Sequence, residues 1–200
     1  MTTRDAILDG ALRAMRSRGL ARATTKEIAR AAGFSEATLY KFFGDKVDLF
    51  LAVLAERLPR VTVLGDGIAG MVGSDTVAGN LSATALELER FFRAVLPIAM
   101  SLFSDRELLA RHRDAVHARG GGPEVLERSV RDYLAAEQAI GRVRADAPVA
   151  GASMALVGAA MHHAFLARFE ADETEADAPP AALRAFADGV AQALLPALLP

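Results

Sequence analysis

The chain has 200 residues, of which 52% are hydrophobic, and a formal net charge of −2. It contains no cysteine, which excludes disulfides, thiolate zinc sites, iron–sulfur clusters and cysteine nucleophiles. No stretch reaches the roughly 18 uninterrupted apolar residues of a membrane span, and the N-terminal segment lacks the apolar core of a signal peptide. We therefore expect a cytoplasmic protein with no membrane partner.

Charge is divided unevenly along the chain. Residues 1–60 contain eleven lysines and arginines against seven acidic residues, a balance of +4, which leaves −6 for residues 61–200. A basic end on an acidic body suits contact with an anionic polymer through that end alone. A chance imbalance remains an open explanation until a motif accompanies the charge.

The first predicted helix covers residues 3–18. Ile7, Ala11 and Met15 recur at i, i+4 and i+8 and form an apolar stripe. Gly19 follows where such a helix ends. This helix can pack over the helices that follow and complete their core.

Two short helices come next, separated by a glycine. Thr24 and Glu27 have the spacing of a capping box that begins one helix. Gly33 lies where the chain must turn, and Ser35 is a good N-cap for the next helix. In that helix Leu39 is expected to point toward the core, which leaves the short residues at the start of the helix facing outward. This arrangement is typical of a helix-turn-helix.

A fourth helix is predicted from Asp45 to Leu58. Asp45 caps it, and Lys46 lies beside the exposed amides of its N-terminus. Such a terminus can hold a phosphate group.

The segment 24–50 resembles the TetR (tetracycline repressor-like) family of transcriptional regulators. The resemblance rests on Thr24-x-x-x-Ile28-Ala29, Ala32-Gly33-Phe34-Ser35, Thr38-Leu39-Tyr40-x-x-Phe43 and Lys46-x-x-Leu49. It covers about the first fifty residues. It departs from the family pattern at Phe42, where a polar residue, often histidine, is usual. That change removes one possible DNA contact and leaves the expected fold unaltered.

The resemblance implies an all-α protein of about nine helices. A DNA-binding domain of three helices with a helix-turn-helix would occupy residues 1–50. A helical bundle for ligand binding and dimerisation would occupy residues 51–200.

Nine residues are candidates for contact with double-stranded DNA. Those expected to touch phosphates are Thr25, Lys26, Ser35, Tyr40 and Lys46. Those expected to meet base edges are Glu36, Ala37, Thr38 and Lys41. Three alternatives stay open: Glu36 can serve the helix dipole, Tyr40 can be a half-buried ring, and Lys41 can be merely solvated.

The pattern beyond residue 58 predicts helices only. Residues 59–74 are expected to be a loose connector, because Pro59 and the glycines of 65–73 weaken a helix. Helices are expected over 75–96, with a break or kink at Pro97, and over 105–118, 123–140, 148–169 and 180–195. The acidic segment 170–180 is expected to be an exposed loop.

The last two helices carry small residues and a broad apolar face that can pair with a second copy of the chain. The residues expected in this homodimer interface are Gly151, Ala155, Gly158, Ala159, Phe186, Val190 and Leu194. These helices can instead fill the core of the monomer. A dimer is favoured because two DNA-binding domains one helical turn apart can read the two halves of a palindrome. The resemblance also implies a homodimer.

Aromatic and methionine side chains of the body can line a pocket for an unknown small effector, apolar or amphipathic. The candidates are Phe91, Phe92, Met100, Phe103, Tyr133, Met154, His162 and Phe165. Each of them also fits an ordinary core. We expect no metal and no cofactor, because His162 and His163 diverge on a helix and the histidines show no metal-ligand spacing.

The sequence therefore predicts a DNA-binding transcriptional regulator, most simply a repressor that binds a palindromic operator as a dimer and is released by the effector. It is not expected to be an enzyme, because no paired catalytic group or cofactor loop is evident. The alternatives are a regulator acting as an activator, a helical enzyme with an accessory DNA-binding head, and a DNA-bending protein without an effector. The last of these would need a more basic chain.

Overall fold

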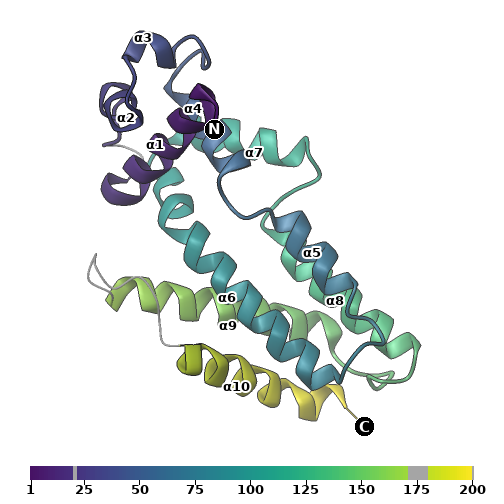
Figure 1. The fold of residues 1–200 in the computed structure, drawn as a ribbon. Helices are drawn as coiled ribbons and strands as arrows, with labels where there is room; N and C mark the ends of the chain where they lie inside the picture. Colours follow the sequence, from purple (N-terminus) through teal and green to yellow (C-terminus); the bar gives the residue numbers. More distant parts are fainter. Residues whose placement is uncertain (20–21, 171–179, 200) are drawn as a thin grey trace. The chain divides into compact units, whose positions relative to one another are not determined.

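The computed structural model describes residues 1–19, 22–170 and 180–199. These residues form ten α-helices and no strand (Figure 1). The all-α class predicted from the sequence is confirmed. The predicted acidic loop at 170–180 falls almost entirely outside the described residues. By packing, the chain divides into two compact units, Met1–Arg60 with Ala94–Gly120 and Val61–Arg93 with Gly121–Pro200.

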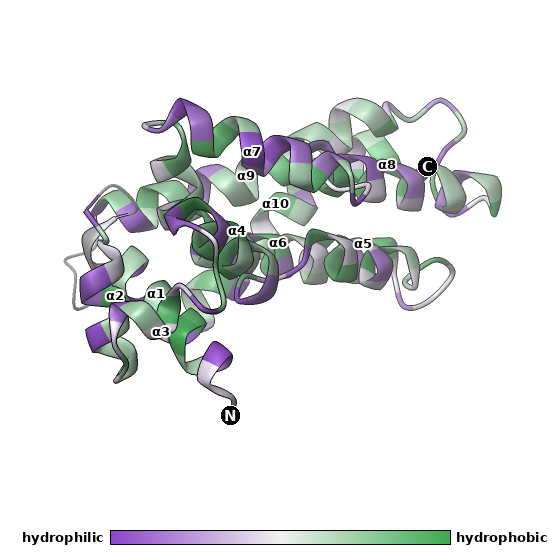
Figure 2. Ribbon diagram, turned by 90° about the horizontal axis from the view of Figure 1, so that it is seen from above, coloured by the Kyte–Doolittle hydropathy of each residue, from purple (hydrophilic) through white to green (hydrophobic). Residues whose placement is uncertain are grey.

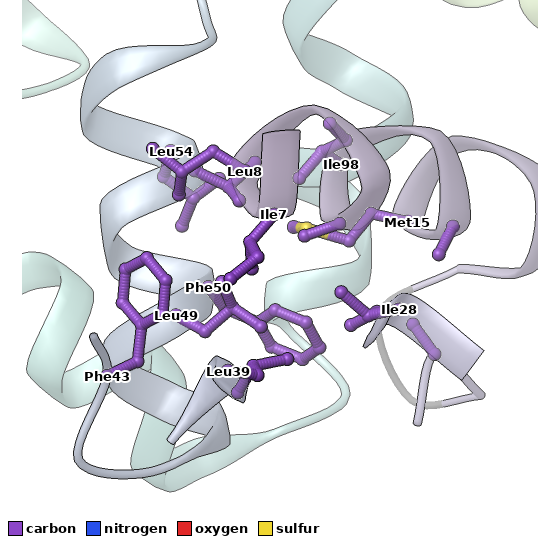
Figure 3. Packing of buried hydrophobic residues seen from close by; sticks show 14 of the residues in the cluster. Ile7, Leu8, Met15, Ile28, Leu39, Phe43, Leu49, Phe50, Leu54 and Ile98 are labelled. Carbon is purple, nitrogen blue, oxygen red and sulfur yellow. The ribbon is translucent and has the colours of Figure 1, made fainter. Parts of the chain in front are cut away.

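The first unit contains the N-terminal helices. They are α1 (Thr3–Arg18), α2 (Thr25–Ala32), α3 (Glu36–Leu39) and α4 (Lys46–Glu56), joined by α7 (Arg106–His117) and the end of α6 (Val77–Leu102). Their apolar side chains form one core, in which Ile7, Leu39 and Leu49 are fully buried. Figure 3 shows the side chains that α1, α2, α3, α4 and α6 contribute to it. The predicted first helix, residues 3–18, is confirmed.

A glycine lets α1 lie directly on α2. A Cβ atom at Gly10 would stand only 3.0 Å from the Cβ of Ala32 and 3.1 Å from its backbone nitrogen. Beside this contact, Nη2 of Arg13 donates a hydrogen bond to the carbonyl oxygen of Ala31 at 3.1 Å. α1 therefore also satisfies a carbonyl in the last turn of α2.

Ion pairs fasten α1 to the end of α4. Arg57 donates to Asp5 and to Asp9, each at 2.7 Å. Arg4 donates a hydrogen bond to each carboxylate oxygen of Glu56, at 2.6 and 2.7 Å. The hydrogen bond from Arg4 lowers the pKa of Glu56. Single exposed ion pairs contribute little, but this group forms a connected network.

The second unit is a separate helical bundle. It consists of α5 (Val61–Ala69), α6 up to Arg93, α8 (Glu124–Ala139), α9 (Val149–Glu170) and α10 (Pro180–Leu198). Its core contains the fully buried side chains Leu81, Leu88, Val130, Leu134 and Leu156. Figure 2, coloured by hydropathy, shows that most of α9 is hydrophobic.

The prediction of a loose connector over residues 59–74 is wrong, because residues 61–69 form α5. α5 lies beside α8 in Figure 1, and Ile68 is buried in the second core. Gly65 faces α8 so closely that a Cβ atom there would lie 2.6 Å from Oγ of Ser129. Here glycine permits close packing of two helices, and packing outweighs its low helix propensity.

Of the break or kink predicted at Pro97, the break is wrong, because α6 continues through this residue to Leu102. Proline removes one amide donor from the helix, and packing holds the remainder, with Ile98 buried in the first core. α6 therefore supplies residues to both cores. The packing boundary also differs from a division at residue 50, because Val53 and Leu54 belong to the first core.

Replacing Gly10 with leucine should lower the free energy of unfolding by about 2 kcal/mol, because the side chain would force α1 away from α2. Urea unfolding followed by circular dichroism measures this change. The matched control is Gly67→Ala in α5, where an added Cβ meets no described atom within 4 Å. That variant should gain about 0.5–1 kcal/mol through helix propensity. Equal effects of the two variants would contradict the close contact.

Candidate nucleic-acid interface

The turn between α2 and α3 is built from local side-chain caps. Thr24 accepts a hydrogen bond from the amide of Glu27 at 3.2 Å, and the Glu27 carboxylate accepts one from the Thr24 amide at 3.3 Å. Gly33 ends α2 with a φ of 81°, in the left-handed region that favours glycine. Ser35 then caps α3 by accepting from the amide of Thr38 at 3.2 Å. The predicted capping box and N-cap are confirmed.

A chain of side-chain hydrogen bonds ties α3 to the start of α2. The hydroxyl of Thr25 donates to the carboxylate of Glu36. The hydroxyl of Tyr40 in turn donates to Oγ1 of Thr25 at 3.4 Å. The sequence left two roles open for Glu36, a base contact and an interaction with the helix dipole. In the structure one of its carboxylate oxygens accepts the hydrogen bond from Thr25.

The other DNA-binding candidates of this segment lie mainly at the surface. Lys26, Ser35, Ala37, Tyr40 and Lys41 are exposed, whereas Thr25, Glu36 and Thr38 are partly buried. Leu39 points inward and is fully buried, as its position in the pattern predicts. Phe42, where the resemblance departs from the family pattern, is 45% exposed. At the start of α3 the short side chains of Ser35 and Ala37 are therefore exposed, while Leu39 holds the helix in the core.

The N-terminus of α4 carries the remaining DNA-binding candidate, Lys46, which is partly buried. Asp45 caps the helix by accepting from the amide of Asp48 at 2.7 Å. Nζ of Lys46 lies 5.1 Å from the ring centroid of Phe50. Arg111 of α7 reaches both aspartates, and sequence reasoning missed it because it lies more than sixty residues away in the chain. No local pattern links it to α4.

The effector-pocket candidates are divided between the two units. Met100 and Phe103 belong to the first unit and are 51% and 74% exposed. Phe91 and Phe92 of α6 are partly buried and meet edge to face, with ring centroids 5.5 Å apart. Tyr133 of α8 is buried in the second core.

The other three pocket candidates lie on α9. Met154, His162 and Phe165 are on the exposed side of this helix rather than inside the second unit. The helical period explains this placement. These residues fall opposite Leu156 and Ala160, which take the buried side. The sequence could not choose between the sides, because α9 is apolar all round.

The dimer candidates of α9 share that exposed side. An added Cβ at Gly151 or Gly158 would meet no described atom within 4 Å. Ala155 is exposed between them. Ala159 and the α10 candidates Phe186, Val190 and Leu194 are partly buried. By length and composition alone, α9 could also cross a membrane, but its other side is packed in the second core.

Two buried acids, which the sequence did not single out, organise the polar groups of the second unit. Glu89 of α6 pairs with Arg93, and its carboxylate accepts a hydrogen bond from Nδ1 of His163 at 3.1 Å. The ring of His163 stacks on Phe186 with centroids 4.0 Å apart. Glu137 of α8 accepts from a loop amide. Among the described residues no three potential metal ligands converge.

A helix-turn-helix with an exposed recognition face defines the class of protein, a helical DNA-binding protein. Residues 7–53 match the family model described as bacterial regulatory proteins, tetR family. The transcriptional repressor AcnR of Corynebacterium efficiens is 31% identical over 153 residues, covering 74% of this chain and 73% of that protein. The chain belongs to the TetR family of transcriptional regulators, which are not enzymes.

Solved structures share the fold over nearly the whole chain. A TetR-family regulator from Mesorhizobium loti is 21% identical with a TM-score of 0.74, covering 99% of this chain and 97% of that one. FadR of Bacillus subtilis, solved with stearoyl-CoA, is 16% identical with a TM-score of 0.66, covering 95% and 96%. At these identities the likeness establishes the fold.

Replacing Tyr133 with phenylalanine should change the free energy of unfolding at neutral pH by less than about 1 kcal/mol, because its buried hydroxyl lies beside Asn80 and Glu137 without a well-aligned hydrogen bond to a described group. Burial raises the pKa of Tyr133 to about 12. The neutral ring therefore stabilises the wild type fully below about pH 10, and this stabilisation is lost as the pH rises toward 12. The phenylalanine variant should lack that alkaline loss.

Urea unfolding at pH 7 and between pH 9 and 11 measures both effects. Tyr40→Phe is the matched control, because Tyr40 is exposed and should change stability by less than about 0.5 kcal/mol. A Tyr133→Phe variant less stable by more than about 1 kcal/mol would mean that the hydroxyl is hydrogen-bonded.

Proposed function

We propose that the protein is a cytoplasmic repressor that binds a palindromic operator as a homodimer and releases it when a small apolar or amphipathic effector binds. The observation that carries this proposal is the surface around α3. Its exposed basic, hydroxyl and short side chains are Lys26, Ser35, Ala37, Tyr40 and Lys41, with the partly buried Lys46 at the α4 N-terminus, and α3 itself is anchored in the first core. The repressor AcnR, a relative over most of the chain, supports the direction of regulation.

The DNA contacts divide into two groups. Lys26, Tyr40 and Lys46 are proposed to touch phosphates and fix the position of the head, with Thr25 and Ser35 as neighbouring hydroxyl groups. Ala37, Thr38 and Lys41 are proposed to meet base edges in the major groove. Glu36 is proposed mainly to position α3, because its carboxylate accepts from Thr25.

Lys46→Ala should weaken binding to all duplexes alike and reduce the slope of log affinity against log salt by about 1 per head. Lys41→Ala should instead relax the preference at one base position of the operator, at a cost of about 1–3 kcal/mol on the preferred duplex. Fluorescence anisotropy measures both, using a duplex that the wild type selects from a random library and a shuffled duplex as control. Loss of preference in the Lys46 variant would contradict the division of roles.

The exposed side of α9 is proposed as the centre of the dimer interface. It combines large apolar groups, Met154 at 63% exposure and Phe165 at 38%, with the small residues Ala155 and Gly158 that permit close approach. Two such helices and two copies of α10 can pack as a four-helix interface. Dimerisation would bury these apolar groups and account for the composition of α9 without a membrane.

The effector is proposed to bind in the second unit. Its core contains partly buried aromatic rings at Phe91, Phe92 and Phe186 and buried polar groups such as Asn80 and Thr84. This mixture suits a ligand with an apolar body and a polar end. α6 contributes to this core and to the core of the head, so it is the element through which binding would alter the head. A coupling of about 3 kcal/mol would weaken operator binding about a hundredfold.

Ala155→Glu should convert the dimer to a monomer at micromolar concentration, because a carboxylate would be buried opposite its own copy. Sedimentation equilibrium measures the change, and binding to the selected duplex should fall to the level of the shuffled one. Ala135→Glu, at an exposed position of α8, is the matched control and should remain dimeric. A dimeric Ala155→Glu variant would place the interface elsewhere.

A further inference from the structure

The N-terminus of α4 carries two carboxylates beside the proposed phosphate contact. Asp45 is the N-cap and Asp48 lies in the first turn. Their side chains are 54% and 45% exposed. A helix N-terminus and Lys46 attract a phosphate, but each nearby carboxylate repels it. This turn by itself has a net charge of −1.

Arg111 of α7 contacts both carboxylates. Its Nη1 lies 3.2 Å from Oδ2 of Asp45, and its Nη2 lies 2.6 Å from Oδ1 of Asp48. All three residues belong to the first unit. A guanidinium fork can reach two carboxylates at once, which the single ammonium of a lysine does less well. With Arg111 in place the charge of the turn is zero.

The ion pairs are not needed to build this part of the fold. Leu108 of α7 is buried in the first core and holds the helix there. Oδ1 of Asp45 caps the amide of Asp48 without involving Arg111, which binds the other carboxylate oxygen. The amide of Asp48 is the main cause that lowers the pKa of Asp45, and Arg111 adds to it. Arg111 adds a positive charge beside both carboxylates and a hydrogen bond that fixes the direction of the Asp48 side chain.

We propose that Arg111 is a positioning residue for DNA binding: it draws the carboxylates of Asp45 and Asp48 toward α7 and neutralises them, so that Lys46 and the helix N-terminus can accept a phosphate. The inference rests on the proposed function of this surface. It adds to the DNA-binding machinery a residue from a helix outside the helix-turn-helix.

The chain offers a matched control on the same helix. Arg113 is 62% exposed, and its Nε lies 3.9 Å from Oδ1 of its neighbour Asp114. Arg113→Ala removes the same charge from α7 without uncovering the two aspartates. Asp48→Asn supplies the complementary test, because it removes one of the carboxylates that Arg111 neutralises.

The experiment measures affinity for the duplex selected by the wild type, by fluorescence anisotropy from low to moderate salt. Arg111→Ala should bind about tenfold more weakly at low salt, and the difference should shrink as salt screens the exposed charges. Arg113→Ala should stay within about twofold of the wild type. Arg111→Lys should recover part of the loss, and Arg111→Ala combined with Asp48→Asn should recover most of it.

Thermal unfolding of each variant identifies the fraction folded, so that only folded protein is compared. Equal losses in Arg111→Ala and Arg113→Ala would overturn the inference, because net charge alone would then explain them. Failure of Asp48→Asn to restore binding in the Arg111→Ala background would also overturn it. A wild-type chain that prefers no duplex would overturn the proposed function instead.

Discussion

The helix α3 has only four residues, and a helix that short is not stable by itself. It persists because Leu39 is fully buried in a core to which five other helices contribute. Side chains then fix its rotation, through the Ser35 cap and the contact between Glu36 and Thr25. The surface offered to DNA is therefore a property of the whole first unit, and any change in that core can alter it.

The first unit also includes segments that lie far from the helix-turn-helix in the sequence, at the end of α6 and in α7. α6 belongs to the second core through Leu81 and Leu88 and to the first core through Ile98 and Leu102. α7 follows it and brings Arg111 to the first turn of α4. Residues 94–120 are thus far from the helix-turn-helix in sequence but part of the same compact unit.

Local signals explain what the sequence predicted well. The capping box at Thr24, the left-handed Gly33 and the Ser35 cap depend on neighbours within four residues, and these features are present. The failures concern packing partners. Gly65 has a low helix propensity, which predicts a loop, but it also lets α5 pack closely against Ser129 of α8. No local sequence pattern indicates that contact. The buried side of α9 was likewise unpredictable, because a helix that is apolar all round has no periodic signal.

The side-chain contacts of the head also bear on why two heads are needed. Glu36 is tied to Thr25, and the hydroxyl of Thr38 lies 2.9 Å from that of Ser35. Ala37 and Lys41 are the exposed candidates for base contact, and two or three contacts discriminate few base pairs. In the proposed homodimer, added specificity would come from a second copy held at a fixed spacing. The exposed apolar side of α9 would then matter as much to sequence selection as α3, because it would set the distance between the two copies of α3.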